Sequence, residues 1–222
     1  MRMTLTVFVL SLAVVGFAIA YSQQQGAKPP QPAQKRGASG TPVDKHGLTT
    51  EPSAAIRICT VSSNCAIKPI NIPTIAPRPE DVASIDGMIK AWYDIVTVPK
   101  GTKPDWARDH TLYTPETRFL STDVDKNGKI RGTIVDHTMY ASGTTPEAKG
   151  FYESEIHRVT QRFGQTAHVM STYESRHTKD GPVIARGVNS IELFNDGARW
   201  WITYAQWDEE RPGNPLPKEL LP

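Results

Sequence analysis

The stretch from residue 162 to 208 constrains the fold of this chain most, because it predicts three successive β-strands. The predicted strands are Gln165–His177, Val183–Asn195 and Arg199–Asp208, each rich in β-branched and aromatic residues. Turn residues separate them, and Asp196-Gly197 between two apolar runs is a strong hairpin signal. This part of the chain is therefore expected to form an antiparallel meander.

A two-residue loop at Asp196-Gly197 would place Asn195 opposite Ala198, and this register decides which side chains share a face. The face expected to point inward is apolar near the turn and polar further away. Its members are Leu193, Ile191, Trp200, Ile202, Asn189, Tyr204 and Gln206. The outer face would carry Trp201 and Trp207, with Arg186 opposite Trp207. Such an inner face suits either a small-molecule pocket or an ordinary amphipathic sheet.

The residues before the meander predict helices followed by strands. From Pro79, apolar residues recur at helical spacing as far as Val96, and Pro99–Gly101 ends this helix. The next expected elements are a helix over 104–110, strands over 117–122 and 129–134, a short helix over 135–142 and a strand over 151–162. A helix is the alternative for 151–162. This order predicts an α+β fold with helices packed on one face of the sheet.

Residues 1–20 are expected to be a secretory signal peptide. Arg2 supplies a positive charge, Leu5–Ile19 is largely apolar, and Ala18-Ile19-Ala20 fits the small-residue cleavage rule. The apolar run is short for a spanning helix, which needs ~20 residues, so an uncleaved anchor is the alternative. We therefore expect a secreted or periplasmic protein, with no membrane span in the mature chain.

The segment between the signal and the domain has the composition of a tether. Residues 21–55 are rich in Gln, Pro, Gly and Ala and are expected to be a disordered linker. Residues 56–77 are expected to be extended, and the only two cysteines, Cys59 and Cys65, are expected to pair in an exported protein. The formal net charge of +2 is far from the footprint of a nucleic-acid-binding protein.

One short motif resembles a metal site. Asp123, Asp125 and Asn127, followed by Gly128, copy the start of a calcium-binding loop. Ile134 stands where such a loop carries a bidentate Glu, so we expect a hairpin turn, with a metal site as the alternative. No cofactor is expected, because the sequence has no dinucleotide fingerprint, Walker loop or His-Glu-x-x-His motif.

Two neighbouring strands carry candidates for acid–base chemistry. Glu155 and His157 would lie on the same side of strand 151–162, where a carboxylate beside an imidazole forms an acid–base pair. A solvated surface pair is the alternative. On the next strand, Ser171, Tyr173 and Ser175 alternate on one side, so that Tyr173 offers its hydroxyl to a ligand.

Taken together, these segments resemble the nuclear transport factor two-like superfamily, which includes ketosteroid isomerases and SnoaL-like cyclases. The resemblance lies in Trp92-Tyr93, Trp106, Arg162–Ala167, Ser171–Glu174, Arg186–Ser190, Asp196–Ile202 and Trp207-Asp208. It implies a cone-shaped α+β domain over 78–210, with a strongly curved antiparallel sheet around N-terminal helices, a concave pocket and frequent dimerisation. Residues 211–222 would be a C-terminal tail. Where many relatives have an inward His on the last strand, this chain has Gln206.

Three functions are compatible with the sequence. The first is an exported protein that binds a small, largely apolar molecule, with Tyr93, Tyr173, Asn189, Tyr204 and Gln206 as ligand contacts. The second is a cofactor-independent isomerase, cyclase or dehydratase, with Glu155 or His157 as base and Tyr173 or Tyr204 polarising an oxygen. The third is a dimeric interaction module whose Trp-rich outer sheet face a second subunit covers.

Overall fold

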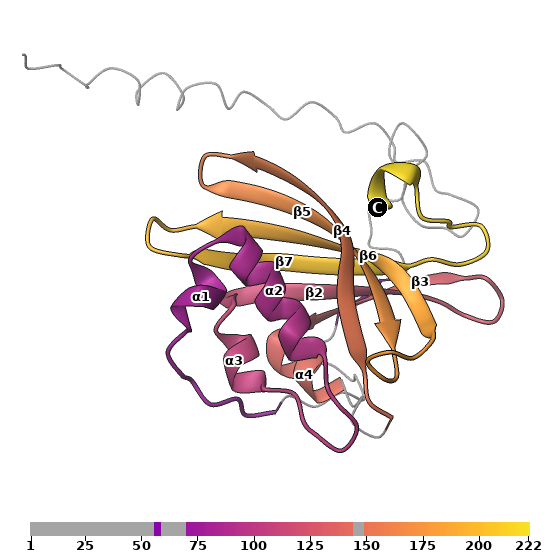
Figure 1. Ribbon diagram of the computed structural model, residues 1–222, viewed down its shortest axis with the longest axis horizontal. Helices are drawn as coiled ribbons and strands as arrows, with labels where there is room; N and C mark the ends of the chain where they lie inside the picture. The colour runs from indigo at the N-terminus through magenta and orange to yellow at the C-terminus, as the bar shows by residue number, and fades with distance from the viewer. Residues whose placement is uncertain (1–55, 59–69, 144–148) are drawn as a thin grey trace, which may run out of the picture. The chain divides into compact units, whose positions relative to one another are not determined.

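The computed structural model of the protein describes residues 56–58, 70–143 and 149–222 (Figure 1). The predicted signal peptide, the linker and the Cys59–Cys65 disulfide lie outside these residues. Within the described ranges, no helix is both long enough and apolar enough to cross a bilayer.

The described strands form one mixed sheet in the order β1-β3-β2-β7-β6-β5-β4. They are β1 (Ile56–Ile58), β2 (Tyr113–Val124), β3 (Ile130–Asp136), β4 (Tyr152–Phe163), β5 (Thr166–Arg176), β6 (Val183–Asn195) and β7 (Trp200–Glu209). β1 runs parallel to β3 and β2 runs parallel to β7, whereas the other neighbouring pairs are antiparallel. The predicted α+β class is confirmed, and β1 extends the sheet beyond the boundary expected at residue 78.

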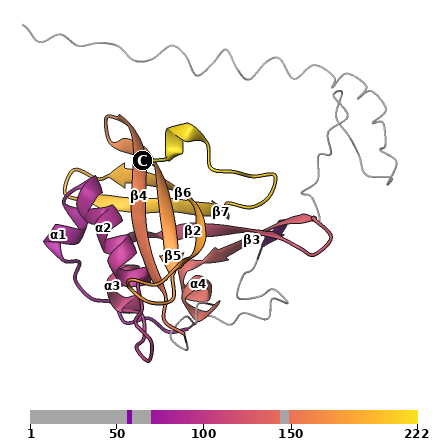
Figure 2. The same ribbon diagram turned by 45° about the vertical axis from the view of Figure 1, so that its right-hand side comes forward.

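The predicted meander is confirmed, because β5, β6 and β7 begin and end within one residue of the expected bounds. Residues 152–163 form strand β4, so the strand interpretation of this segment was right and the helical alternative was wrong. The sheet bends strongly: in Figure 2, β4 and β5 stand nearly upright while β7 and β2 run across the view. This bend gives the sheet a hollow side.

The helices lie on that hollow side, as Figure 1 shows for α1, α2 and α3. The helices are α1 (Pro79–Val82), α2 (Ile85–Val96), α3 (Trp106–His110) and α4 (His137–Gly143). α2 packs against β4 and β7, and α4 packs against β2 and β3. The apolar side chains of α2 meet those of the inner sheet face in one core, which includes Met88, Ile89, Trp92, Ile95, Phe119, Val169, Ile191 and Ile202.

The single helix expected over 79–96 is two helices. Ser84 has an extended backbone, and its Oγ accepts the backbone N–H of Gly87 at 3.0 Å, which is an N-cap that begins α2. The Glu80 carbonyl of α1 lies so close that a Cβ at Gly87 would be 2.1 Å from it. The continuous apolar stripe concealed this break, because both helices place their apolar residues against the same core.

The register expected at the last hairpin is wrong. Asn195 pairs with Trp200, not Ala198, because Asp196 Oδ1 accepts the N–H groups of both Ala198 and Arg199 and widens the loop. The β6–β7 pairing then shifts by one residue between Glu192 and Leu193, which is a β-bulge. Beyond this bulge, the side chains of β7 lie on the face opposite to the one that simple alternation predicts.

The C-terminal residues continue from the sheet into a short 3-10 helix, η2 (Lys218–Leu220). Thr172 on β5 donates its hydroxyl to the Leu220 carbonyl oxygen at 2.6 Å. Thr172 is fully buried although it points away from the core residues next to it in sequence. The predicted tail therefore contacts the outer face of β5.

Candidate ligand-binding site

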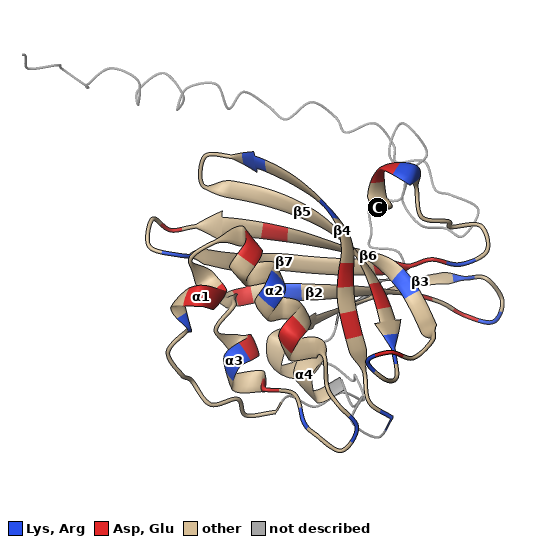
Figure 3. Cartoon of the chain, in the orientation of Figure 1, with Lys and Arg blue, Asp and Glu red and all other residues tan. Residues whose placement is uncertain are grey.

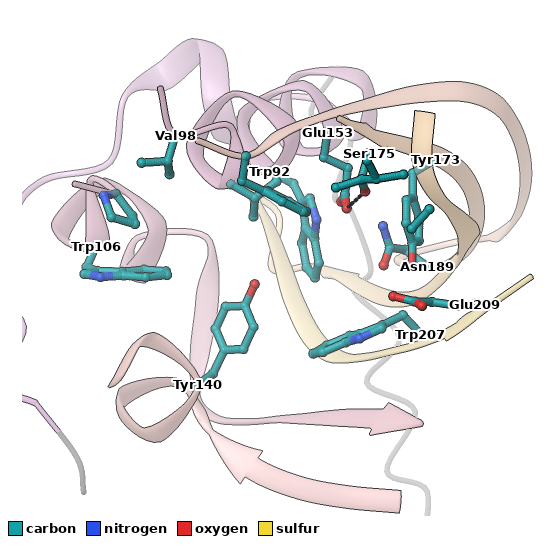
Figure 4. Close-up of a pocket in the computed structure, with 15 residues that line it drawn as sticks. Trp92, Val98, Trp106, Tyr140, Glu153, Tyr173, Ser175, Asn189, Trp207 and Glu209 are labelled. Atoms are coloured by element: carbon teal, nitrogen blue, oxygen red, sulfur yellow. Dashed lines mark hydrogen bonds between the residues drawn. The ribbon is translucent and has the colours of Figure 1, made fainter. Parts of the chain in front are cut away.

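A cavity of about 410 Å³ opens between the helices and the hollow side of the sheet (Figure 4). Its wall is mainly aromatic and aliphatic, with two carboxylates and few other polar groups. The lining residues are Trp92, Val96, Val98, Pro104, Trp106, Tyr140, Phe151, Glu153, Tyr173, Ser175, Ile184, Ala185, Asn189, Trp207 and Glu209. An apolar cavity with a few converging polar groups is the usual form of a small-molecule site.

The aromatic rings of the wall stand at steep angles to one another. Tyr140 meets Trp106 edge-on at 5.9 Å and 78°, and it meets Trp207 at 5.8 Å and 65°. Behind it, Phe119 stacks on the Tyr140 ring at 4.6 Å. The wall therefore holds several differently oriented rings, and Phe119 supports one of them from the core.

Glu153 is the main polar group of the cavity. Ser175 Oγ donates to Glu153 Oε2 at 3.0 Å. Burial raises the pKa of the Glu153 carboxyl to about 7, the hydrogen bonds from Ser175 and Asn189 oppose this rise, and the negative charge of Glu209 adds to it. Because this pKa lies near neutrality, the carboxyl can act as a proton donor or as a proton acceptor at physiological pH.

The end of α2 fixes the position of Glu153. Thr97, the residue that ends α2, accepts the Glu153 backbone N–H with its Oγ1 and donates the same hydroxyl to the Glu153 carbonyl, both at 3.1 Å. Next to it, Val98 and Phe151 form a bridge with backbone hydrogen bonds in both directions. The first residues of β4 are thus attached to the end of α2, and the Glu153 side chain is directed into the cavity.

A chain of hydrogen bonds leads from the cavity to the far side of α2. Asn189 Nδ2 donates to the Tyr93 hydroxyl at 3.2 Å, and that hydroxyl lies 2.7 Å from Ser171 Oγ. Ser171 Oγ donates to Glu155 Oε1 at 2.5 Å, and Arg158 holds both oxygens of Glu155 at 2.7 and 2.6 Å. The Glu155 carboxylate can only accept, so Ser171 uses its proton for Glu155 and must accept the proton of the Tyr93 hydroxyl. The Tyr93 oxygen is then left to accept from the Asn189 amide, which fixes the orientation of that amide.

Glu155 and Arg158 line a second, polar cleft of about 480 Å³ together with Lys90, Asp94, Arg108 and Ser154. Tyr93 and Glu153 also border this cleft. Elsewhere acidic and basic residues are interspersed over the described elements (Figure 3). The aromatic cavity and the polar cleft are therefore neighbours that share Glu153.

Only two of the five predicted ligand contacts line the aromatic cavity. Tyr173 and Asn189 line the aromatic cavity, and Tyr93 holds Asn189 from behind. Tyr204 and Gln206 do not line it. The β6–β7 bulge places Ala205 opposite Ile191 and Trp207 opposite Asn189, on the inner face, so Tyr204 and Gln206 point outward.

The predicted pairing of Glu155 with His157 is also wrong. The β4–β5 register shifts between these two residues, so that Glu155 pairs with Tyr173 and His157 pairs with Thr172. Since Tyr173 and Thr172 point to opposite faces, Glu155 and His157 do as well. Ile156 is the extra residue of this second bulge.

The Trp-rich outer face expected for a subunit contact is not formed. Trp207, which was expected on that face, lines the cavity, whereas Trp200 is 3% exposed in the core, on the inner face where it was expected. Trp201 points outward, where the Arg199 guanidinium covers it at 3.6 Å and Asp196 accepts its indole N–H at 2.7 Å. Arg186 pairs with Glu210 instead of stacking on Trp207.

The turn that resembles a calcium loop is held by hydrogen bonds between the Asp125 side chain and nearby residues of the same turn. Asp125 Oδ1 accepts the N–H groups of Asn127 and Lys129, and Asp125 Oδ2 contacts Arg131 at 2.9 Å. Gly128 has φ +76°, the left-handed conformation that such a turn requires. Nowhere in the described ranges do three His, Cys, Asp or Glu side chains gather as metal ligands, Asp123 included.

Most of the residues that line the cavity were not expected from the sequence. Trp92, Trp106 and Tyr140 fall within the expected helices, Trp207 was expected on the outer face, and no pattern in the sequence singles out Glu153. The aromatic residues of three separate helices and of β7 meet only in the folded chain. No local spacing in the sequence indicates that convergence.

Comparisons with known proteins found similarity only among solved structures. No family model matches the chain, and no curated protein matches it. Among solved structures, it is similar to a nuclear transport factor two-like protein of unknown function from Shewanella baltica, with 11% identity, coverage of 57% of this chain and 91% of that one, and a TM-score of 0.40. It is also similar to an uncharacterised protein with a cystatin-like fold from Caulobacter vibrioides, with 15% identity, coverage of 59% and 90%, and a TM-score of 0.40. At such low similarity, these structures carry no information about a ligand.

Proposed function

We propose that this protein binds a small, largely apolar molecule in the aromatic cavity, with Glu153, Asn189 and Tyr173 as the polar groups that orient it. The observation that supports this most directly is a 410 Å³ space lined by aromatic rings, into which a carboxyl with a pKa of about 7 projects. The protein would act outside the cytoplasm, as the predicted signal peptide indicates.

Fluorescence tests the binding directly, because three tryptophans line the cavity. A neutral apolar probe such as N-phenyl-1-naphthylamine should gain fluorescence on binding and quench the tryptophans. Ala185→Trp places an indole inside the cavity and should abolish the effect, whereas Gln206→Trp places an indole on the outer face and should preserve it. Equal binding by both variants, or none by the wild type, would refute the proposal.

A second candidate is acid–base catalysis with Glu153 as the base, for which its raised pKa is the specific observation. Glu153 takes the place of Glu155 and His157 in this hypothesis, since Arg158 and Ser171 occupy Glu155 and His157 faces outward. Burial also raises the pKa of Tyr173, so its phenol stays neutral and can donate to a developing oxyanion.

Deuterium exchange tests this second candidate without knowledge of the natural substrate. Cyclic ketones incubated with the protein in D₂O should exchange protons on the carbon next to the carbonyl faster than in buffer. Glu153→Gln keeps the shape of the side chain and should remove the acceleration, whereas Glu192→Gln on the outer face of β6 should not. No acceleration by the wild type would count against catalysis and leave binding untouched.

A further inference from the structure

Neither carboxylate of the cavity forms an ion pair within the described residues, although the charge of Arg211 interacts with Glu209 through space. Glu153 is hydrogen-bonded by neutral groups, Ser175 and Asn189. Among the described residues, none donates a hydrogen bond to the Glu209 carboxylate or pairs with it. No Lys, Arg or His of the described chain lines the cavity. Glu209 acts on Glu153 as a repelling charge, so the wall of the cavity is negative.

Other carboxylates close to the cavity strands, by contrast, form ion pairs with arginines. Arg158 pairs with Glu155 at 2.6 Å, Arg176 with Glu174 at 2.5 Å, and Arg186 with Glu210 at 2.7 Å. Asp208, next to Glu209 in sequence, pairs with Arg211 at 2.5 Å. These four carboxylates are therefore held in ion pairs, whereas neither Glu153 nor Glu209 forms one within the described residues.

The rings of the wall suit a positive charge as well. The face of an aromatic ring is negative and attracts cations within about 6 Å of its centre. This protein already uses that attraction at Trp201, where Arg199 lies 3.6 Å from the ring centre, and at Trp200, where Arg162 lies at 4.9 Å. Among the described residues, no guanidinium occupies the equivalent position at Trp106 or Trp207.

We propose that the ligand of the cavity is an organic cation, a protonated or quaternary amine, whose charge lies between Glu153 and Glu209 and whose apolar groups contact the surrounding rings. Figure 4 shows both carboxylates directed toward the same space, beside Trp207 and Trp92. This inference rests on the proposed binding function and adds the charge of the ligand. A bare metal ion fits the site less well, because two carboxylates among aromatic rings offer too few oxygen ligands.

A pair of probes of the same shape separates charge from hydrophobicity. Phenyltrimethylammonium is the cation, and tert-butylbenzene is its neutral isostere. Tryptophan quenching at low salt and pH 8 should show the cation binding about tenfold more tightly or better, from cation–π and ionic attraction together. In Glu209→Gln this preference should fall about threefold, and in the double variant with Glu153→Gln only the part supplied by the aromatic rings should remain, while the binding of the neutral probe changes much less.

Glu192→Gln is the matched control, because it removes the same charge from the outer face of β6. It should leave the preference for the cation unchanged. If both probes bind equally to the wild type, the charge proposal is refuted and the cavity remains a neutral apolar site. If neither probe nor the neutral naphthylamine binds, the proposed function itself fails.

Discussion

Asp109 and Glu153 are both enclosed acidic side chains, but the protein surrounds them in opposite ways. Asp109 is 0% exposed, and each of its oxygens has a partner: Tyr113 donates its hydroxyl at 3.0 Å, and His137 Nε2 lies at 2.7 Å. Glu153 has only neutral donors and faces an open cavity with a second carboxylate in its wall. A buried acid with complete partners stabilises the fold, whereas one with incomplete partners beside a cavity is available to a ligand.

The hydrogen bonds and ring contacts around Asp109 extend beyond Tyr113 and His137. The His137 ring continues from Asp109 to His110, with 3.0 Å between the two Nδ1 atoms, and Tyr113, Trp106 and Tyr140 pack around it. This cluster lies behind the aromatic wall. It connects α3, α4 and β2, so its loss should disturb the scaffold before it disturbs the ligand.

The largest expected effect is the loss of stability in Asp109→Ala. Removal of this carboxylate leaves the buried Tyr113 hydroxyl and His137 Nε2 without their acceptor, at an expected cost of about 4 kcal/mol in the free energy of unfolding. Urea denaturation followed by circular dichroism measures it. A loss below about 1 kcal/mol would show that Asp109 is no more structural than Glu153.

Glu153→Gln should change how stability depends on pH. The folded-state pKa of Glu153 is raised to about 7 from an ordinary value of 4.5, so the folded protein binds more protons than the unfolded chain between these two pH values. Its contribution to stability is therefore greatest below pH 4.5 and is lost as the pH rises through 7, by up to about 3 kcal/mol.

The Gln variant cannot titrate, so its stability should fall less than that of the wild type between pH 4.5 and 8. Denaturant midpoints measured at several pH values give the two curves. Glu192→Gln, on the outer face, should retain the slope of the wild type. Parallel curves for the Glu153 variant and the wild type would mean that the carboxyl is solvated like a surface group.

An intermediate effect is expected in Tyr93→Phe, which removes the hydroxyl that joins Asn189 to Ser171. The lost hydrogen bonds should cost about 1 kcal/mol of stability. Because Asn189 then loses its orientation, binding of a cavity probe should weaken even though Tyr93 does not line the aromatic cavity. The matched variant Tyr204→Phe removes an outward hydroxyl and should leave binding unchanged; a loss of binding there would argue against the observed register.

The sequence predicts the positions of the strands well, but it predicts poorly which face of the sheet each side chain occupies. Strand residues and hairpin turns are local features, so β4 to β7 could be placed to within a residue. A bulge adds one unpaired residue and reverses the alternation beyond it. The extra residue Ile156 thus separates Glu155 from His157, and the shift near Thr203 exchanges Gln206 for Trp207 in the cavity.

The partial success at the site follows from the same cause. Tyr173 and Asn189 were identified correctly as inward residues because they lie on β5 and β6, whose mutual register is regular over that region. Gly187 pairs with Tyr173, and a Cβ there would be 2.5 Å from the Tyr173 hydroxyl, so the ring lies directly over a glycine. The sequence does not single out Glu153, because its environment is made by α2, β6 and β7, which are distant in sequence.

The smallest effect on stability is expected at His110, which belongs to the Asp109 cluster and should have a pH dependence opposite to that of Glu153. Its ring is half-buried at the end of the Asp109 cluster, and burial lowers its pKa, with the neighbouring His137 lowering it further and Asp109 opposing. The unfolded chain therefore binds more protons than the folded one just below pH 6.5, so this residue makes stability rise with pH, opposite to Glu153. His110→Gln should cost about 0.5 kcal/mol near neutral pH and remove this rise. Measured in the Glu153→Gln background, where the opposing slope is absent, the rise should be visible before and absent after the second substitution; if it persists, a different group titrates in this range.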